Sequence, residues 1–350
     1  MQNISKKTKP STKILRALGL GKRVVKTIKN MIKWCKIIAW RKATLNNFNK
    51  IVEEICIEKG INCTFLSKDW LIILEKDGKR RFITGYKFDI NRCGASLLSD
   101  DKFSTYTYLN NQNIPVVSEK IIYSSSNKNA FAKDANSIEV VKDYFEKYNN
   151  NIVIKQNKGT CGNGIEHITD MDTLEEVYER MSRRYYSVCL SPYYDIENEY
   201  RVIMVDSNPR LMYKKMKPVV IGNGKDDIKT LLCNFNPKFF ENKEIKENRV
   251  LAENEVYQYD WKHNLCKGAK VSMDIDEEIR KIIQDLAIRT ANTIGLRFES
   301  VDIIKTYNNE YYVMEVNSGV MMDNFIDQVE NGYEISKNIY KEVIDKMMEE

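Results

Sequence analysis

The chain lacks any long apolar segment. Its longest unbroken apolar run is the five residues 70–74, whereas a membrane-spanning helix needs roughly 18 or more. Before residue 45 the longest such run is 37–40, which is too short for the hydrophobic region of a secretory signal. These absences predict a cytoplasmic protein without a bilayer-spanning segment.

Glycine and proline are scarce, with 15 and 6 residues among 350, which excludes fibrous and low-complexity classes. Because 43% of the residues are hydrophobic and 10% are aromatic, the chain can bury a core, and its length predicts two or three domains. The 8 cysteines include no Cys-x-x-Cys pair, and there are only 2 histidines. We therefore expect no structural zinc site, and we expect the cysteines to be reduced and buried.

Acidic residues are absent from the first 50 positions, which contain 14 Lys or Arg. The remaining 300 residues carry 41 basic and 49 acidic groups, so a mildly acidic body follows a basic arm. Apolar residues recur in the arm at helical spacing, with lysines on the other side, which predicts a basic amphipathic helix within residues 1–45. Two interpretations stay open: the arm contacts a membrane surface, nucleic acid or an acidic partner, or it packs on the body. The apolar positions are Val24, Ile28, Met31, Ile32, Cys35 and Ile38.

The body alternates between helix and strand patterns, and no internal repeat is visible. We expect the first helix to end at Gly60, and the second to be capped by Ser99 or Asp100. The expected helices are 46–59, 101–110, 172–183, 226–232, 276–293 and 338–348. The expected strands are 63–66, 70–74, 81–84, one near 121, 152–155, 164–168 and 200–205.

Residues 300–317 predict an acidic hairpin. A two-residue turn at Asn308-Asn309 would place Asp302 directly opposite Glu315, with Asn317 on the same face. Like charges in that position destabilise a sheet by roughly 0.2 to 1 kcal/mol, so we expect a cation beside them. Mg²⁺ prefers such oxygen ligands. The alternative is an acidic hairpin that faces solvent.

A glycine-rich loop separates two expected antiparallel strands, 152–155 and 164–168. Its exposed N–H groups would suit a phosphate. Its spacing matches neither the P-loop nor the Rossmann fingerprint, so a plain flexible hairpin stays open. Lys155 ends an apolar strand, and a nearly buried lysine needs an anionic partner to stay charged.

Together these motifs resemble the ATP-grasp superfamily, especially the branch with cyanophycin synthetase, glutathione synthetase and the ribosomal-protein glutamate ligases. The resemblance runs in order from about residue 88 to residue 317. Two positions depart from it: Ser191 replaces the acidic or amide residue usual before the hinge, and Ser-Gly-Val-Met-Met follows Asn317 in place of x-x-Pro-Gly. The segments that carry the resemblance are 91–102, 152–155, 190–194, 199–202, 219–224, 264–269, 301–303 and 314–318.

The resemblance implies an α+β ATP-grasp fold, in which two α/β subdomains grip ATP. A small α/β N-terminal domain and the basic helical arm would precede them. The implied divisions are an arm at 1–45, an N-terminal domain at 46–112, a small subdomain with a glycine-rich lid at 113–195, and a large subdomain with the metal site at 196–350.

The resemblance also implies roles for individual residues. Independently of the resemblance, His167 and His263 are expected to be structural, because no partner that would orient either ring is visible in the sequence. ATP would be held by Lys102 and Lys155 at its phosphates, by Lys158, Gly159 and Gly162 in the lid, by Pro192, Tyr193 and Tyr194 at the adenine, and by Asp195 or Glu197 at the ribose. Arg201 would face the transferred phosphoryl group, with Asn264 and Gly268 beside the acyl phosphate. Asp302, Glu315 and Asn317 would bind one or two Mg²⁺ ions, with Mn²⁺ as an alternative.

The activity implied by the resemblance is that of an ATP-dependent carboxylate-amine ligase, acting through an acyl phosphate with release of ADP and phosphate. Its substrates would be small-molecule or peptide carboxylates and amines, and a homodimer is compatible with this interpretation. One alternative is a phosphotransferase or a peptide-modifying macrocyclase. Another is a lipid- or nucleic-acid-binding protein with a degenerate ATP site, peripheral to the membrane through its arm.

Overall fold

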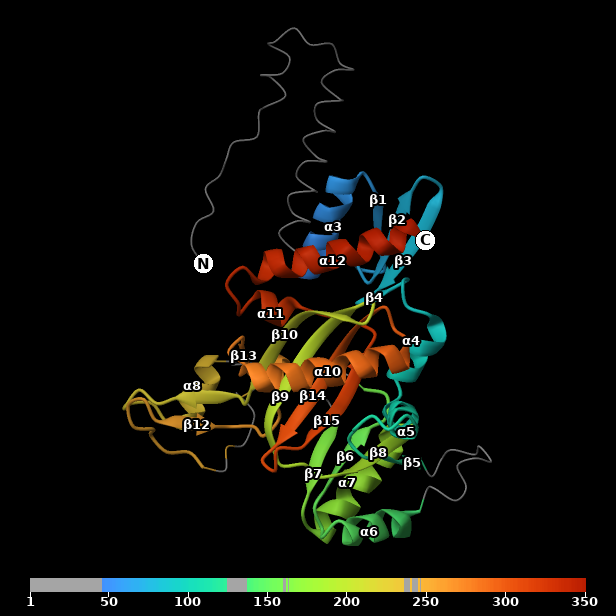
Figure 1. Ribbon diagram of the computed structural model, residues 1–350. Coiled ribbons are helices and arrows are strands. Elements are labelled where there is room, and N and C mark those ends of the chain that lie inside the picture. The colour runs from blue at the N-terminus through green and yellow to red at the C-terminus, as the bar shows by residue number, and fades with distance from the viewer. Residues whose placement is uncertain are drawn as a thin grey trace, which may run out of the picture.

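The computed structural model describes residues 46–124, 137–159, 162, 164–235, 240, 245 and 247–350. The basic helix expected within residues 1–45 lies outside them. The described elements form two four-stranded sheets, one five-stranded sheet and a two-stranded ribbon, with helices against their faces (Figure 1). The predicted α+β class of fold is confirmed. None of the helices in the described ranges is both long and apolar enough to cross a membrane.

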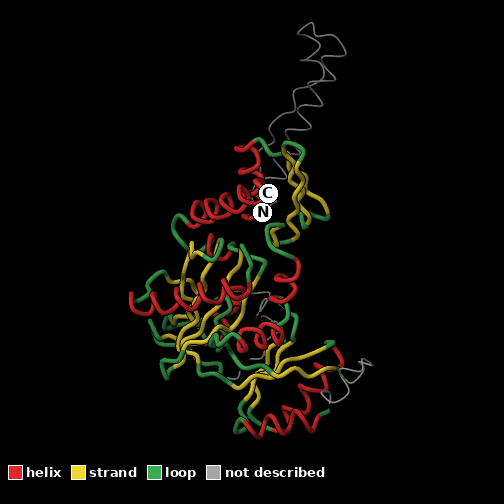
Figure 2. The backbone as a smooth tube through the Cα atoms, turned by 45° about the vertical axis from the view of Figure 1, so that its right-hand side comes forward, coloured by secondary structure: helices red, strands yellow, loops and turns green. Residues whose placement is uncertain are grey.

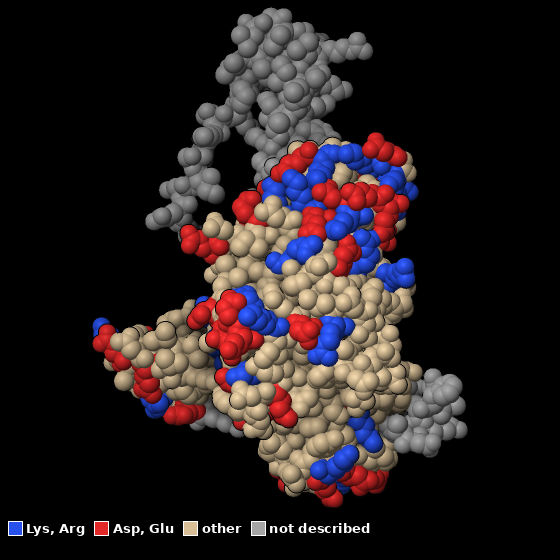
Figure 3. Space-filling model, in the orientation of Figure 1, with Lys and Arg blue, Asp and Glu red and all other residues tan. Residues whose placement is uncertain are grey.

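The N-terminal sheet packs against two helices from opposite ends of the chain. Helix α3 begins after Asn46, whose side chain accepts the N–H of Asn49, and ends at Gly60 with φ 63°, as predicted. The C-terminal helix α12 packs on α3, and both helices share one core with this sheet and the large sheet. Lys and Arg alternate with Asp and Glu over this pair of helices (Figure 3), and Lys337 bridges Glu54 and Glu58. The elements are α3 Asn47–Lys59, β1 Asn62–Leu66, β2 Leu71–Lys76, β3 Lys79–Thr84, β4 Lys87–Phe88 and α12 Gly332–Glu349.

The large sheet has the strand order β13-β10-β9-β14-β15, and every neighbouring pair is antiparallel. Helix α10 covers one face, where apolar residues of β9 and β14 alternate inward. The opposite face is apolar at the end near α12 and charged at the other end. Its elements are β9 Ile196–Val205, β10 Asn208–Met216, β13 Lys270–Ser272, α10 Glu277–Ile294, β14 Phe298–Thr306 and β15 Tyr311–Asn317.

The small sheet has the antiparallel order β5-β8-β6-β7. Helices α6 and α7 bury Ile152 and Ile154 of its central strand β6. The other face therefore carries Val153 and Lys155, because alternate strand residues point to opposite faces. Figure 2 shows this sheet and the N-terminal sheet at opposite ends of the molecule, with the large sheet between them. The elements are β5 Lys120–Tyr123, α6 Ile138–Lys147, β6 Ile152–Gln156, β7 Ile165–Ile168, α7 Met171–Arg184 and β8 Ser187–Pro192.

The remaining elements connect the sheets or flank the large one. Ribbon β11-β12 and helix α8 enclose a separate small core that includes Phe240 and Leu251. These elements are α4 Cys93–Ser99, α5 Lys102–Asn111, β11 Val219–Ile221, α8 Ile228–Phe235, β12 Val256–Gln258, the 3-10 turn η2 Leu265–Lys267 and α11 Asp323–Ile326.

Several local predictions need correction. The N-cap of α5 is Asp101, not Ser99 or Asp100, because residues 93–99 form the separate helix α4. The hairpin turn is longer than two residues, since Thr306 donates its N–H to Glu310, but a bulge after Asp302 restores the predicted pairing of Asp302 with Glu315. None of the six described cysteines is in a disulfide, yet Cys93 and Cys266 are exposed rather than buried.

Candidate active site

A charged row crosses the large sheet at the end away from α12. The strand register places Asp302 between Arg201 on β9 and Glu315 on β15. Arg201 donates to both oxygens of Asp302, from Nε at 2.7 Å and from Nη2 at 2.6 Å. Lys215 adds a third bond, 2.9 Å from its Nζ to Oδ2. The cation expected beside the paired acids is thus supplied to Asp302 by the protein itself.

These contacts fix the charge of Asp302, which is only 1% exposed. Burial alone would raise the pKa of this carboxyl, but the charges of Arg201 and Lys215 outweigh burial and hold the pKa well below its usual range. Asp302 is therefore ionised in the folded protein at neutral pH. The alternative of a solvent-facing acidic hairpin is wrong for this residue.

Lys215 joins Asp302 to a second buried acid, Glu199, with which it forms an ion pair. At 5% exposure, Lys215 does not lie on a solvated face. His263 lies beside this cluster, with its Nδ1 3.9 Å from Glu199 Oε2. Burial and the nearby Lys217 and Lys215 lower the pKa of His263 to about 4, so its ring is neutral at pH 7.

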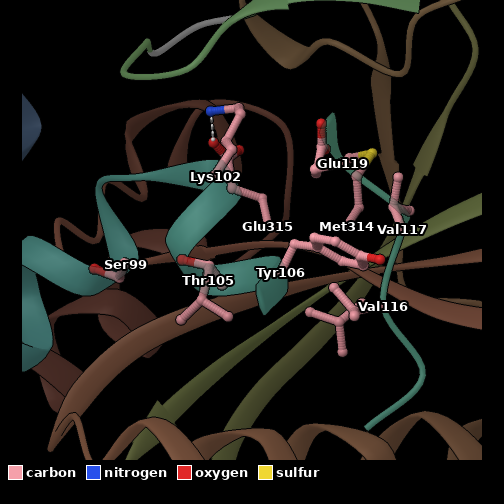
Figure 4. Close-up of a pocket in the computed structure, with 11 residues that line it drawn as sticks. Ser99, Lys102, Thr105, Tyr106, Val116, Val117, Glu119, Met314 and Glu315 are labelled. Carbon is pink, nitrogen blue, oxygen red and sulfur yellow. Dashed lines mark hydrogen bonds and ion pairs between the residues drawn. The ribbon is translucent and has the colours of Figure 1, made fainter. Parts of the chain in front are cut away.

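Glu315 pairs with Lys102, the first residue of α5. Their Oε1 and Nζ atoms are 2.7 Å apart, and the same Nζ donates to the carbonyl oxygen of Gly159 at 3.2 Å. Burial opposes the charge of Glu315, but Lys102 lowers its pKa below the usual value. Figure 4 shows this pair at the wall of a small pocket between α5, β15 and residues 116–119. One lysine thus links the acidic hairpin to the start of the glycine-rich loop.

Lys155 projects from the face of the small sheet that α6 and α7 leave uncovered. Its anionic partner is Glu119, at 2.5 Å, and both side chains are more than nine-tenths buried. Burial opposes the charge of Lys155, but attraction to Glu119 raises its pKa above the usual value. The sequence predicted an anionic partner and missed that residue. The second oxygen of Glu119 is buried without a hydrogen-bond partner among the described residues.

The predicted hinge residues make contacts within the protein. Pro192 ends β8, and the N–H of Tyr193 donates to the carbonyl oxygen of Asn151 at 3.1 Å. The Tyr193 ring stacks on His167 with centroids 4.0 Å apart. The hydroxyl of Tyr194 accepts the N–H of Ser118.

The two candidates for ribose differ in their contacts. Glu197 is paired with Lys305 at 2.6 Å, whereas Asp195 is exposed and forms no ion pair with a described residue. Asp195 is therefore the ribose candidate whose carboxylate is better placed to accept a new hydrogen bond.

The glycine-rich loop approaches the large subdomain at Asn264. A Cβ on Gly162 would lie 2.6 Å from the Asn264 amide nitrogen, and the φ of 62° at this position is one that favours glycine. Lys158 is largely exposed, with its Nζ 3.7 Å from Asp101. Gly268 has φ 100°, and a Cβ at this position would collide with Tyr259 and Phe235, which gives this glycine a packing role.

The residues present fit a magnesium ion in part. Glu315 Oε2 and the Asn317 side chain make no hydrogen bond with any described residue. Both residues lie on the charged face of the large sheet opposite α10, which we call the cleft face. Hard oxygen donors of this kind suit Mg²⁺. Asp302 could join them through Oδ1, which accepts one hydrogen bond, from Arg201 Nε, whereas Oδ2 accepts two. The described ranges contain no group of three His, Cys, Asp or Glu side chains that could hold a metal ion by themselves. The candidate set here comprises two carboxylates and an amide.

Sequence comparison covers the C-terminal part of the chain. The family model described as the RimK-like ATP-grasp domain matches residues 245–344, a segment that contains Asn264 and the acidic hairpin. No curated protein matches the chain significantly in sequence.

Structural comparison extends over more of the chain. A bifunctional glutathione synthetase from Pasteurella multocida matches with a TM-score of 0.51 and 16% identity, over 85% of this chain and 44% of that one. This chain therefore spans less than half the length of that synthetase. A D-alanine–D-alanine ligase from Bacillus anthracis matches with a TM-score of 0.49 and 13% identity, over 75% and 69% of the two chains. The ATP-grasp ligase PsnB, complexed with minimal precursor, matches with a TM-score of 0.42 and 16% identity, over 72% and 64%.

Proposed function

The chain has the fold of the ATP-grasp superfamily, and on this premise we propose that it is an ATP-dependent carboxylate-amine ligase. The proposed reaction has two steps. A substrate carboxylate attacks the γ-phosphate of ATP to give an acyl phosphate and ADP. An amine then attacks the acyl carbon, an amide bond forms, and phosphate leaves.

The observation that carries this proposal is a pair of ion-paired lysines that reach the site from separate elements, Lys155 buried and Lys102 partly buried. Lys155 lies on a strand of the small sheet, Lys102 begins α5, and each is held by one carboxylate. A phosphate chain could replace Glu119 and Glu315 as the anionic partner of these lysines. Phosphoryl transfer depends mainly on this kind of positioning and charge neutralisation.

Arg201 is the group best placed to act on the transferred phosphoryl. It lies in the same row as Asp302 and Glu315, and its forked guanidinium can bind two oxygens at once. Gly162 and Asn264 bring the lid against the large subdomain, which would exclude water from an acyl phosphate. Neutral His263 and Glu199 would keep Lys215 in position beneath the acids.

Glu315, Asn317 and Asp302 would hold Mg²⁺. A bound Mg²⁺ would offset the negative charge of the phosphates. Mn²⁺ is an alternative ion at the same oxygens.

The test is ADP release from the full chain with Mg²⁺ and ATP, screened against amino acids, short peptides and carrier-bound acids, each with and without an amine. We expect ADP and phosphate in equal amounts only when both a carboxylate and an amine are present. A stable phosphorylated product would instead establish a phosphotransferase. If no substrate pair stimulates release and ATP itself does not bind, the ligase proposal fails.

The matched variants are Arg201→Lys and Arg210→Lys. The first keeps the charge but loses the fork, and we expect turnover to fall by about 10²-fold or more with little change in ATP affinity. The second alters an exposed arginine that pairs with Glu342 outside the cleft and should leave turnover unchanged. Equal turnover in both variants would remove Arg201 from the reaction.

A further inference from the structure

Asn157 connects the two elements that carry the lysines. It follows Lys155 by two positions, directly after β6, and is 1% exposed. Its side-chain Nδ2 donates to Asp101 Oδ2 at 2.9 Å, and its Oδ1 accepts the N–H of Phe103 at 3.1 Å. Its carbonyl oxygen accepts the N–H of Lys102 at 3.4 Å. Asn157, which lies in the β6–β7 hairpin, thus binds three successive residues at the start of α5.

The first N–H groups of a helix need partners from outside the helix. In α5 the N–H of Ser104 goes to Asp101 Oδ1 at 2.9 Å, and those of Lys102 and Phe103 go to Asn157. The N-terminus of α5 is therefore closed by Asn157 and Asp101 together. An anion cannot bind these N–H groups directly, so contact with phosphates from this end falls to the Lys102 side chain.

Asn157 is itself fixed on its other side. Its N–H donates to the carbonyl oxygen of Ser187 at 3.2 Å, and its Oδ1 also accepts from Cys189 Sγ at 3.2 Å. Both partners belong to β8, the neighbour of β6 in the small sheet. Asn157 therefore fixes the position of α5 relative to strands β6 and β8 of the small sheet.

We propose that Asn157 is a positioning residue that sets where Lys102 stands relative to Lys155, so that both lysines reach one polyphosphate chain. The inference rests on the proposed function for the phosphate roles of the two lysines. Asn157 acts only through Asp101 and the α5 backbone, and it need not touch ATP. The arrangement requires a donor at one position of the pair and a carboxylate at the other.

That requirement can be tested by exchanging the two side chains. Asn157→Asp sets two carboxylates against each other where Nδ2 and Oδ2 now lie 2.9 Å apart. Asp101→Asn in the same chain restores a donor and an acceptor, because its amide can still cap Ser104 while donating to the carboxylate at 157. We expect Asn157→Asp to raise the Kd for ATP with Mg²⁺ by at least tenfold in titration calorimetry. We expect the double exchange to bring it back within about threefold of the parent chain.

A second readout follows amide hydrogen exchange at residues 102–105. We expect at least tenfold faster exchange there in Asn157→Asp and recovery in the double exchange. Asp170→Ala is the matched control, because it removes the N-cap of α7 in the same subdomain, at Thr173, and touches neither lysine. It should lower the melting temperature and leave the Kd for ATP unchanged.

The outcomes separate the two proposals. If Asn157→Asp folds and binds ATP within twofold of the parent chain, or the double exchange fails to restore affinity, the positioning role is overturned. Unchanged exchange at residues 102–105 would overturn it as well. If the parent chain itself does not bind ATP, the ligase proposal fails, and hydrogen exchange still decides whether Asn157 fastens α5.

Discussion

Strand β14 buries two carboxyl groups three positions apart, and the two have opposite charge states. Glu299 and Asp302 are 0% and 1% exposed. Neither carboxyl oxygen of Glu299 makes a hydrogen bond with a described residue, and burial raises the pKa of this group to about 8. Asp302 accepts three bonds from Arg201 and Lys215, and its pKa is held below the usual range. Since burial is equal, the partners decide the charge.

The two carboxyls point to opposite faces of the same strand. Glu299 shares its face with Val301 and Ile303, which pack under α10, and its neighbour across the ladder is Met204. Asp302 faces the cleft. A perturbed buried carboxyl is therefore not enough to identify a site in this protein; the convergence of cations from β9 and β10 is what distinguishes the cleft face.

The largest effect on stability is expected from neutralising Asp302, the carboxyl of the two that has hydrogen-bond partners. Asp302→Asn would leave the buried Lys215 and the partly buried Arg201 without their full countercharge, and we expect a loss of about 3–5 kcal/mol in the free energy of unfolding. ADP formation should be abolished in the same variant. Urea unfolding followed by circular dichroism measures the first effect. A loss below about 1 kcal/mol would show that the two cations find other partners.

Glu299→Gln should instead stabilise the folded protein, by an amount that depends on pH. Between the unfolded pKa near 4.5 and the folded pKa of about 8, the folded state binds more protons than the unfolded state, so stability falls as pH rises. The amide removes this dependence. We expect the variant to match the parent chain near pH 4 and to exceed its unfolding free energy at pH 7 by about 3 kcal/mol.

Unfolding curves at several pH values test this prediction as a difference between parent and variant, which cancels the other titrating groups. A constant difference from pH 4 to pH 8 would mean that Glu299 is solvated or paired in solution.

The sequence was sufficient where the signal was local. The pairing of Asp302 with Glu315 follows from one hairpin, and it survived a wrong turn length because the bulge compensated for the longer loop. Helix α3 and its stop at Gly60 were likewise determined by neighbouring residues. The fold resemblance rested on motifs of this kind.

Contacts between distant strands could not be predicted in the same way. Glu119 reaches Lys155 only because β8 lies between β5 and β6, and Lys215 reaches Asp302 only because β10 flanks β9. No pattern within a single segment encodes those neighbours. The packing of α12 on α3 was missed for the same reason, although the C-terminal helix itself was predicted.

Glu119→Gln tests an intermediate case, a buried partner that a ligand could replace. The neutral amide keeps the shape but weakens the bond to Lys155, and we expect a loss of about 1.5–3 kcal/mol without nucleotide. Saturating ATP should shrink this loss, because a phosphate can take over the role of the carboxylate. Thermal unfolding with and without ATP and Mg²⁺ measures both values. An equal loss in both conditions would place the phosphates away from Lys155.

The smallest effect on stability is expected for an ion pair on the protein surface, where water can solvate both charges. Arg289 and Asp285 form an i,i+4 pair on α10 at 2.9 Å, with side chains 47% and 70% exposed. Water already satisfies both charges, so a double-mutant cycle with Ala at each position should give a coupling of about 0.3–0.5 kcal/mol, reduced by salt. A coupling as large as the Asp302 effect would mean that ion-pair geometry alone sets the stability. The contrast between Glu299 and Asp302 would then no longer follow from burial acting together with partners.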